Sequence, residues 1–207
     1  MRRKMLAKMF IATAVVFAVV GITSTVVADA PSGSWAIDDD RSQIRFVSDA
    51  PMERFTGTSS AIEGEIRFDP DDPSATEGTI QFPVESVETG NSTRDRHLTQ
   101  ESWLHADEHP NVTFEIGEFE DVRVARGDER LDFEGTATGT VTMRGESNEE
   151  EAKVQVAVLP DQNLARVQFE LDFSVRDYGV EGTRDRGIGS SVGETIDVEG
   201  TIYATAE

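Results

Sequence analysis

The sequence has 207 residues, with 40 acidic side chains against 19 Lys and Arg, and a formal net charge of −21. This length fits one medium-sized domain. The negative charge argues against a nucleic acid partner, because binding phosphates requires a cationic surface. The sequence has no Cys, which excludes disulfides, thiolate metal sites and cysteine nucleophiles.

The N-terminus has the organisation of an export signal. Basic residues at 2–4 and an apolar run over 9–20 are followed by small residues at Ala28 and Ala30. The apolar run is shorter than the roughly 20 residues that a membrane span needs. The pattern predicts a signal peptide over 1–28, cleaved after Ala28 or Ala30, and a periplasmic or secreted protein without a stable membrane span.

Beyond a short leader at 29–33, apolar and polar residues alternate with a period of two. The alternation is strict over 167–176 and over 195–204. Such a pattern is typical of antiparallel strands with one buried and one solvated face. Shorter runs of the same kind, separated by turn sequences, include those at 44–46, 62–68, 80–84, 112–116 and 154–158.

The number of these runs predicts the architecture. They give about eight to ten strands, enough to close a barrel or to form a pair of packed sheets. No shift in composition marks a second domain. We therefore predict an all-β fold, an extended antiparallel β-barrel, as one domain over 34–207.

One polar stretch before Pro110 departs from the strand pattern. Its apolar residues Leu98, Trp103 and Leu104 are spaced so that they could share one face of a helix. The sequence therefore predicts a short helical segment near 92–108, lying over the barrel wall or across one end.

All three histidines, His97, His105 and His109, lie in the same stretch. On a helix, the spacing of His105 and His109 would place two imidazoles on one face, as in many metal sites. The stretch lacks the catalytic Glu position of the H-E-x-x-H motif, and Pro110 limits the helix. We therefore expect no metal, no cofactor and no catalytic residue, with a His-dependent metal-binding or enzymatic protein as the alternative.

The inward positions of the alternating runs combine large and small residues. Aromatic and aliphatic side chains are interrupted by Gly64, Ala137, Gly139 and Gly200. This mixture indicates either tight interdigitation or a cavity lined by aromatics. The side chains predicted to contact an apolar ligand are Phe46, Ile66, Phe82, Trp103, Phe114, Phe169 and Phe173.

Arginines form a second group of candidates. The sequence Thr-Arg-Asp-Arg occurs at both 93–96 and 183–186. Guanidinium groups can bind a phosphate or carboxylate head group through two hydrogen bonds, or they can pair with neighbouring carboxylates. The candidates for head-group binding are Arg94, His97, Arg176 and Arg184.

Six motifs follow one another through the sequence. They lie at 35–46 (Trp-Ala-Ile-Asp and Ser-Gln-Ile-Arg-Phe), 64–70, 84–98, 109–114, 139–145 and 175–180. This series resembles the YceI-like family over nearly all of 34–205. Residues 146–149, the pair Trp103-Leu104 and the loop at 181–191 depart from the family pattern.

The resemblance implies a lipocalin-like barrel that is exported and has an elongated pocket for a long apolar molecule. The expected partner is a polyisoprenoid or a related amphiphilic lipid, which the protein would carry, buffer or bind in a stress-related role. The resemblance implies no settled catalytic activity, and homodimerisation stays open. A ligand-free interaction module with a solidly packed interior is the further alternative.

Overall fold

The computed structural model describes residues 31–49, 54–127, 129–180 and 193–207. The predicted signal peptide, both cleavage positions and Arg184 lie outside these residues. Within them the fold is all-β with one short α-helix, as predicted. The strands are β1 (Gly33–Asp49), β2 (Arg54–Ser59), β3 (Glu63–Phe68), β4 (Glu77–Pro83), β5 (Asn111–Arg126), β6 (Leu131–Met143), β7 (Glu146–Leu159), β8 (Leu164–Ser174) and β9 (Thr195–Ala206).

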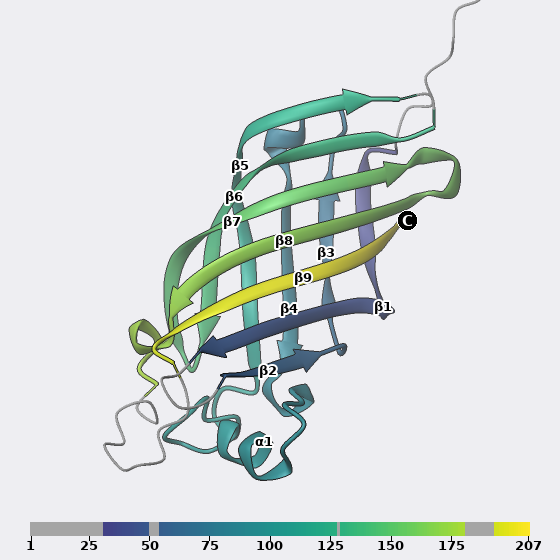
Figure 1. Ribbon diagram of the computed structural model, residues 1–207. Helices are drawn as coiled ribbons and strands as arrows, with labels where there is room; N and C mark the ends of the chain where they lie inside the picture. Colours follow the sequence, from purple (N-terminus) through teal and green to yellow (C-terminus); the bar gives the residue numbers. More distant parts are fainter. Residues whose placement is uncertain (1–30, 50–53, 128, 181–192) are drawn as a thin grey trace, which may run out of the picture.

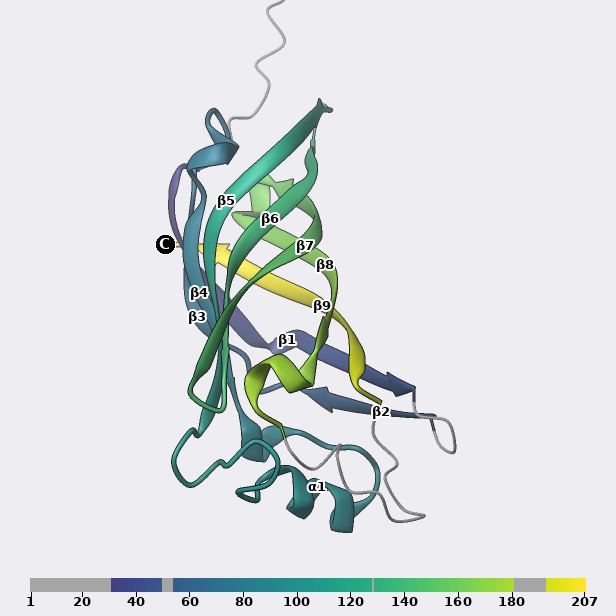
Figure 2. The same ribbon diagram turned by 90° about the vertical axis from the view of Figure 1, so that its left-hand side faces the viewer.

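Eight of these strands close an antiparallel barrel, in which β9 returns to pair with β1. The remaining strand, β2, pairs with β1 from Ile44 to Asp49, whereas β3 pairs with it from Gly33 to Ala36. The helix α1 (Ser92–Leu98) lies at one end of the barrel, and the β5–β6 hairpin projects at the other (Figures 1 and 2).

A bend in β1 separates the part that pairs with β3 from the part that pairs with β2. Its register against β9 shifts between Asp38 and Gln43. Ser42 is buried at the bend, where its hydroxyl donates to the Asp38 carbonyl at 2.6 Å and accepts from the Tyr203 amide at 3.0 Å. The side chain thus satisfies backbone groups that the irregular ladder leaves unpaired.

The helical prediction for 92–108 is right only for its first part. The Asn91 side chain accepts from the amides of Thr93 and Arg94 and so caps the start of α1. Beyond Leu98 the chain makes turns, and His105 adopts a positive φ of 52°. Leu98 is already buried at the barrel end, and the turns return the chain toward the barrel instead of extending away from it.

Short 3-10 helices connect several strands. They are η1 (Pro73–Ala75), η2 (Val84–Ser86), η3 (Pro160–Gln162) and η4 (Val175–Tyr178). No helix in the described part of the chain is long and apolar enough to cross a membrane.

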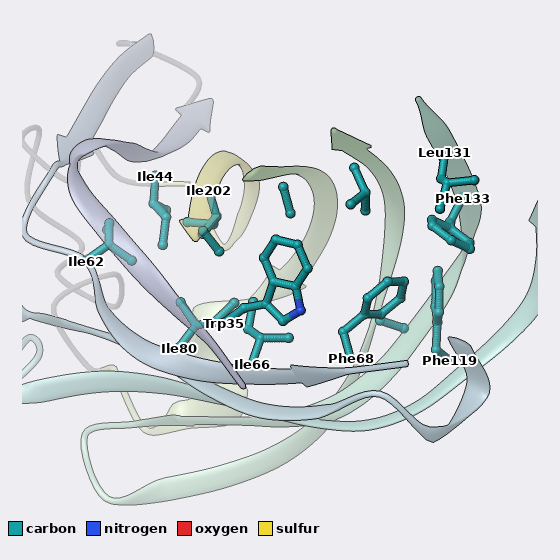
Figure 3. Packing of buried hydrophobic residues seen from close by; sticks show 14 residues of the cluster. Trp35, Ile44, Ile62, Ile66, Phe68, Ile80, Phe119, Leu131, Phe133 and Ile202 are labelled. Carbon is teal, nitrogen blue, oxygen red and sulfur yellow. The ribbon is translucent and has the colours of Figure 1, made fainter. Parts of the chain in front are cut away.

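The buried apolar residues form two clusters. The first surrounds Trp35 and includes the edge-to-face pair Phe68 and Phe133, whose ring centroids lie 5.1 Å apart (Figure 3). The second lies beside η4 and contains Met143 and Tyr178. Together they pack the interior at separate places and leave space along the barrel.

Candidate apolar binding site

The barrel contains an apolar cavity of about 210 Å³. All nine strands contribute to its lining, and so do side chains between β4 and β5. Thr76 and Thr113 are the polar residues in this lining, and the others are aliphatic, aromatic or Met. None of the described lining residues is ionisable, so the cavity can hold apolar matter but offers no general acid or base.

The structure brings all seven residues predicted to contact an apolar ligand around this cavity. They are Phe46, Ile66, Phe82, Trp103, Phe114, Phe169 and Phe173. Six of them, all except Ile66, are only half-buried although they point inward. Partial exposure of an inward ring is expected where the ring faces open space, not packed neighbours. Their contact with a ligand stays a prediction.

Sequence reasoning missed other aromatic residues of the lining, among them Phe55, Phe68 and Phe119. Phe119 is the instructive case, because counting by twos from Phe114 points it outward. A register shift between Ile116 and Glu118 inserts one residue into the count and turns Phe119 inward. The glycine at position 117 was the available signal for this irregularity.

At some inward glycines, a phenylalanine ring from the neighbouring strand occupies the space that a side chain would fill. A Cβ on Gly200 would overlap the Phe169 ring from the paired position on β8, and a Cβ on Gly139 would lie 2.6 Å from the Phe114 ring. The rings therefore lie partly over the neighbouring strands and still line the cavity. Interdigitation and a cavity, which the sequence left as alternatives, therefore occur together.

The α1 end of the cavity is covered by the connection between β4 and β5. Leu98, Trp103 and Leu104 line the cavity from this connection. Arg144, in the turn between β6 and β7, donates to the Glu101 carbonyl at 2.9 Å and to the Gly179 carbonyl at 2.6 Å. This guanidinium therefore fastens the connection to η4 and to the barrel.

The head-group candidates are not gathered in one cluster. Arg94 donates to the Thr89 hydroxyl at 3.0 Å, and its guanidinium lies 4.0 Å from the ring centroid of Phe55, which lines the cavity. Arg176 pairs with Glu194 at 2.8 Å, and His97 is exposed. Arg184 lies outside the described residues, so head-group binding stays a prediction for all four.

Two buried polar groups lie in the same interior. Tyr178 is fully buried and donates to the Glu150 carboxylate at 2.7 Å. Burial raises the pKa of the Tyr178 phenol, and the hydrogen bond to Glu150 raises it further. The Trp35 indole N–H has no hydrogen-bond partner among the described residues. Neither arrangement supplies a nucleophile, so both are structural features of the barrel.

A closed antiparallel barrel with a dry, aromatic-lined lumen defines a lipocalin-like barrel of the class that encloses apolar molecules. The particular family follows from comparison with known proteins. The model of the YceI-like domain matches residues 35–204, and the chain belongs to the YceI-like family, as the motif series predicts.

The curated relatives that the chain matches are named UPF0312 proteins. The chain is 28% identical over 129 residues to a UPF0312 protein of Pseudomonas aeruginosa, covering 60% of this chain and 63% of that one. It is 30% identical over 89 residues to a UPF0312 protein of Pectobacterium carotovorum, covering 43% and 42%. These matches span about half the length of the curated relatives.

Solved structures support the fold. A polyisoprenoid binding domain from Saccharophagus degradans superposes with a TM-score of 0.67 at 18% identity, covering 86% of this chain and 100% of that one. BcnA of Burkholderia cenocepacia gives 0.66 at 18% identity, with 82% and 99% covered. The YCEI protein of Campylobacter jejuni gives 0.54 at 26% identity, with 73% and 84% covered.

Proposed function

We propose that this protein binds the apolar chain of a polyisoprenoid or a related amphiphilic lipid inside its barrel and acts as an exported carrier or buffer. The observation that carries the proposal is the cavity, whose lining is almost entirely aliphatic and aromatic. The polyisoprenoid binding domain of Saccharophagus degradans, which shares the fold, supports the choice of ligand class. The predicted signal peptide supports export.

The size of the cavity limits what it holds. A buried water needs about 10–15 Å³ on the same scale, so 210 Å³ accommodates on the order of 15–20 carbon-sized groups. At about 0.8 kcal/mol each, these groups contribute roughly 12–16 kcal/mol. Association costs at least about 4 kcal/mol, so the affinity is no tighter than micromolar for the smaller figure and nanomolar for the larger.

A polyisoprenoid chain of about forty carbons, for example, is therefore longer than this cavity can enclose without widening. We infer that a segment nearer 15–20 carbons lies inside, with any remainder and the polar head outside. The polar head is best placed at the α1 end, where it would lie beside the β4–β5 connection that covers the cavity, because Arg94 lies there against Phe55, a residue of the lining. At this position a guanidinium can meet a phosphate or carboxylate head while the chain stays in the apolar lumen.

The same lining favours binding over catalysis. A general acid or base has to reach the reacting atom, and no ionisable side chain is among the described residues that line the cavity. The cavity also counts against a ligand-free module with a filled interior.

Two measurements test the proposal. Native mass spectrometry of protein purified from its own host should show a co-purifying apolar mass. After delipidation, the protein should take up fluorescent fatty-acid and isoprenoid analogues with one molecule per barrel. Failure to take up any long-chain analogue, with the fold intact by circular dichroism, would rule the proposal out.

A further inference from the structure

Three potential metal ligands meet in the turn that joins α1 to β5. The ligand atoms of His105, Glu108 and His109 all lie within 4.8 Å of one another. Nδ1 of His105 is 3.8 Å from a carboxylate oxygen of Glu108, and the two imidazole rings lie edge to face with centroids 5.8 Å apart.

The backbone of the turn produces this convergence. The His105 carbonyl accepts hydrogen bonds from the amides of Glu108 at 3.1 Å and of His109 at 2.9 Å. The chain therefore wraps around one carbonyl, and residues four apart face the same side although the segment is not a helix. The positive φ of His105 starts this turn.

Packing restricts one of the rings further. The His109 ring lies against Gly145 in the β6–β7 turn, where a Cβ would be 2.6 Å from its Cε1 atom. The His105 side chain is mostly buried, with 21% of its surface exposed, whereas that of Glu108 is 69% exposed. Two imidazoles held by packing and an exposed carboxylate can close around an ion at little entropic cost.

We propose that His105, Glu108 and His109 bind a divalent transition-metal ion of the Zn²⁺, Cu²⁺ or Ni²⁺ type. Imidazole favours these ions over Mg²⁺ and Ca²⁺, which prefer sites made of oxygen atoms alone. Bonds of about 2.0–2.2 Å to a tetrahedral ion place ligand atoms roughly 3.3 Å apart, so small side-chain rotations suffice. Three protein ligands leave a fourth position for water.

This site differs from the expectation of no metal drawn from the sequence. On a helix, the sequence offers two histidines without the Glu of the H-E-x-x-H motif. The turn instead recruits Glu108, which immediately precedes His109.

Binding would stiffen one wall of the cavity. The turn follows directly on Trp103 and Leu104, which line the cavity, and Ala106 within it is buried. An ion that cross-links positions 105 and 109 would hold this wall in place, and we expect it to slow exchange of an apolar ligand. The metal site itself does not depend on the proposed lipid function.

Zn²⁺ binding to the mature full-length chain tests the site. The protein is stripped with a chelator and titrated calorimetrically with Zn²⁺ in excess Mg²⁺, which occupies the many surface carboxylates. We expect one tightly bound ion per chain. Replacing His105 or His109 by Ala should weaken binding by at least about 100-fold, since even changes outside the ligand shell cost 10–100-fold.

His97→Ala is the matched control, because His97, on α1, is the third histidine of the sequence and is not among the three ligands. The proposal is overturned if Zn²⁺ binds with no defined stoichiometry, or if His97→Ala weakens it as much as His105→Ala does. Should His109→Ala unfold, the Co²⁺ absorption spectrum of the wild-type chain still decides, since a three-ligand site gives intense visible bands and scattered carboxylates do not.

The link to the cavity has its own readout. Zn²⁺ should slow release of a fluorescent fatty-acid analogue from the wild-type protein and have no effect on His105→Ala. If no analogue binds, the calorimetric result stands alone, so failure of the lipid proposal and failure of the metal proposal are distinguishable.

Discussion

Enlarging a side chain that lines the cavity tests whether the cavity is empty. Ala152 on β7 lies opposite Ala137 on β6, and both are buried and line the cavity. The substitution Ala152→Leu adds three carbon atoms at this point. It therefore removes space for about three of the 15–20 carbon-sized groups that the cavity can hold.

The expected loss of affinity follows from that displacement. Three carbons at about 0.8 kcal/mol each give a binding free energy weaker by roughly 2.4 kcal/mol, which is about 50-fold in Kd. Stability should respond differently. In a filled interior the larger side chain would cost about 1–3 kcal/mol and lower Tm by several degrees, whereas an empty lumen accepts it without loss.

The assay is displacement of a fluorescent fatty-acid analogue, combined with thermal unfolding. Thr138→Leu is the matched control, because Thr138 neighbours Ala137 on β6 and pairs with the exposed Glu151. We expect unchanged affinity in this control. If Ala152→Leu lowers Tm and leaves affinity intact, the interior is packed and the cavity does not bind the ligand.

Two further predictions concern residues beside the cavity. Gly200→Ala should lower the free energy of unfolding by about 1–3 kcal/mol in urea titrations, because the new methyl group would displace the Phe169 ring. An unchanged free energy of unfolding would show that the Phe169 ring does not pack against Gly200. Wild-type stability should fall as pH rises above about 10, since burial first and Glu150 second raise the pKa of Tyr178 above its unfolded value. Tyr178→Phe should remove this part of the alkaline loss, and identical pH profiles for the two proteins would contradict the assignment.

Local alternation was sufficient to predict most of the strands, although not β2, and much of the lining. The period of two along β8 places Phe169 and Phe173 on the inner face, and the structure shows both there. Such a period survives only while the ladder is regular. The shift after Ile116 reverses the parity, which is why Phe119 could not be assigned without the partner strand.

The chain beyond Leu98 could not be predicted from spacing. A helical face and a series of turns can both present Leu98, Trp103 and Leu104 to one surface. Burial of Leu98 against the barrel and the hydrogen bonds of Arg144 decide between them, and both are long-range contacts. The carboxylate beside the two imidazoles was missed for a local reason, because a turn at His105 and not a helix brings Glu108 to the histidines.

A buried polar atom of Trp35 gives a last prediction. Nε1 of Trp35 is buried and has no partner among the described residues, although the indole lines the cavity (Figure 3). A buried donor without an acceptor costs about 1–3 kcal/mol. Trp35→Phe removes this donor together with part of the ring, so the lost contacts and the relieved cost should nearly offset each other.

We therefore expect Trp35→Phe to change stability by less than about 1 kcal/mol and to leave the affinity for a saturated chain within a few-fold of wild type. The comparison that decides is between two ligands, one hydrocarbon-like throughout and one with a carbonyl in its inner segment. Equal changes in the affinity for both ligands mean that the lining around Trp35 recognises a purely apolar segment, as the rest of the lining does. A loss of affinity confined to the carbonyl-bearing ligand would mean that the indole N–H reaches into the lumen and binds an acceptor on the ligand. That result would contradict recognition of the inner segment by shape and apolar contact alone.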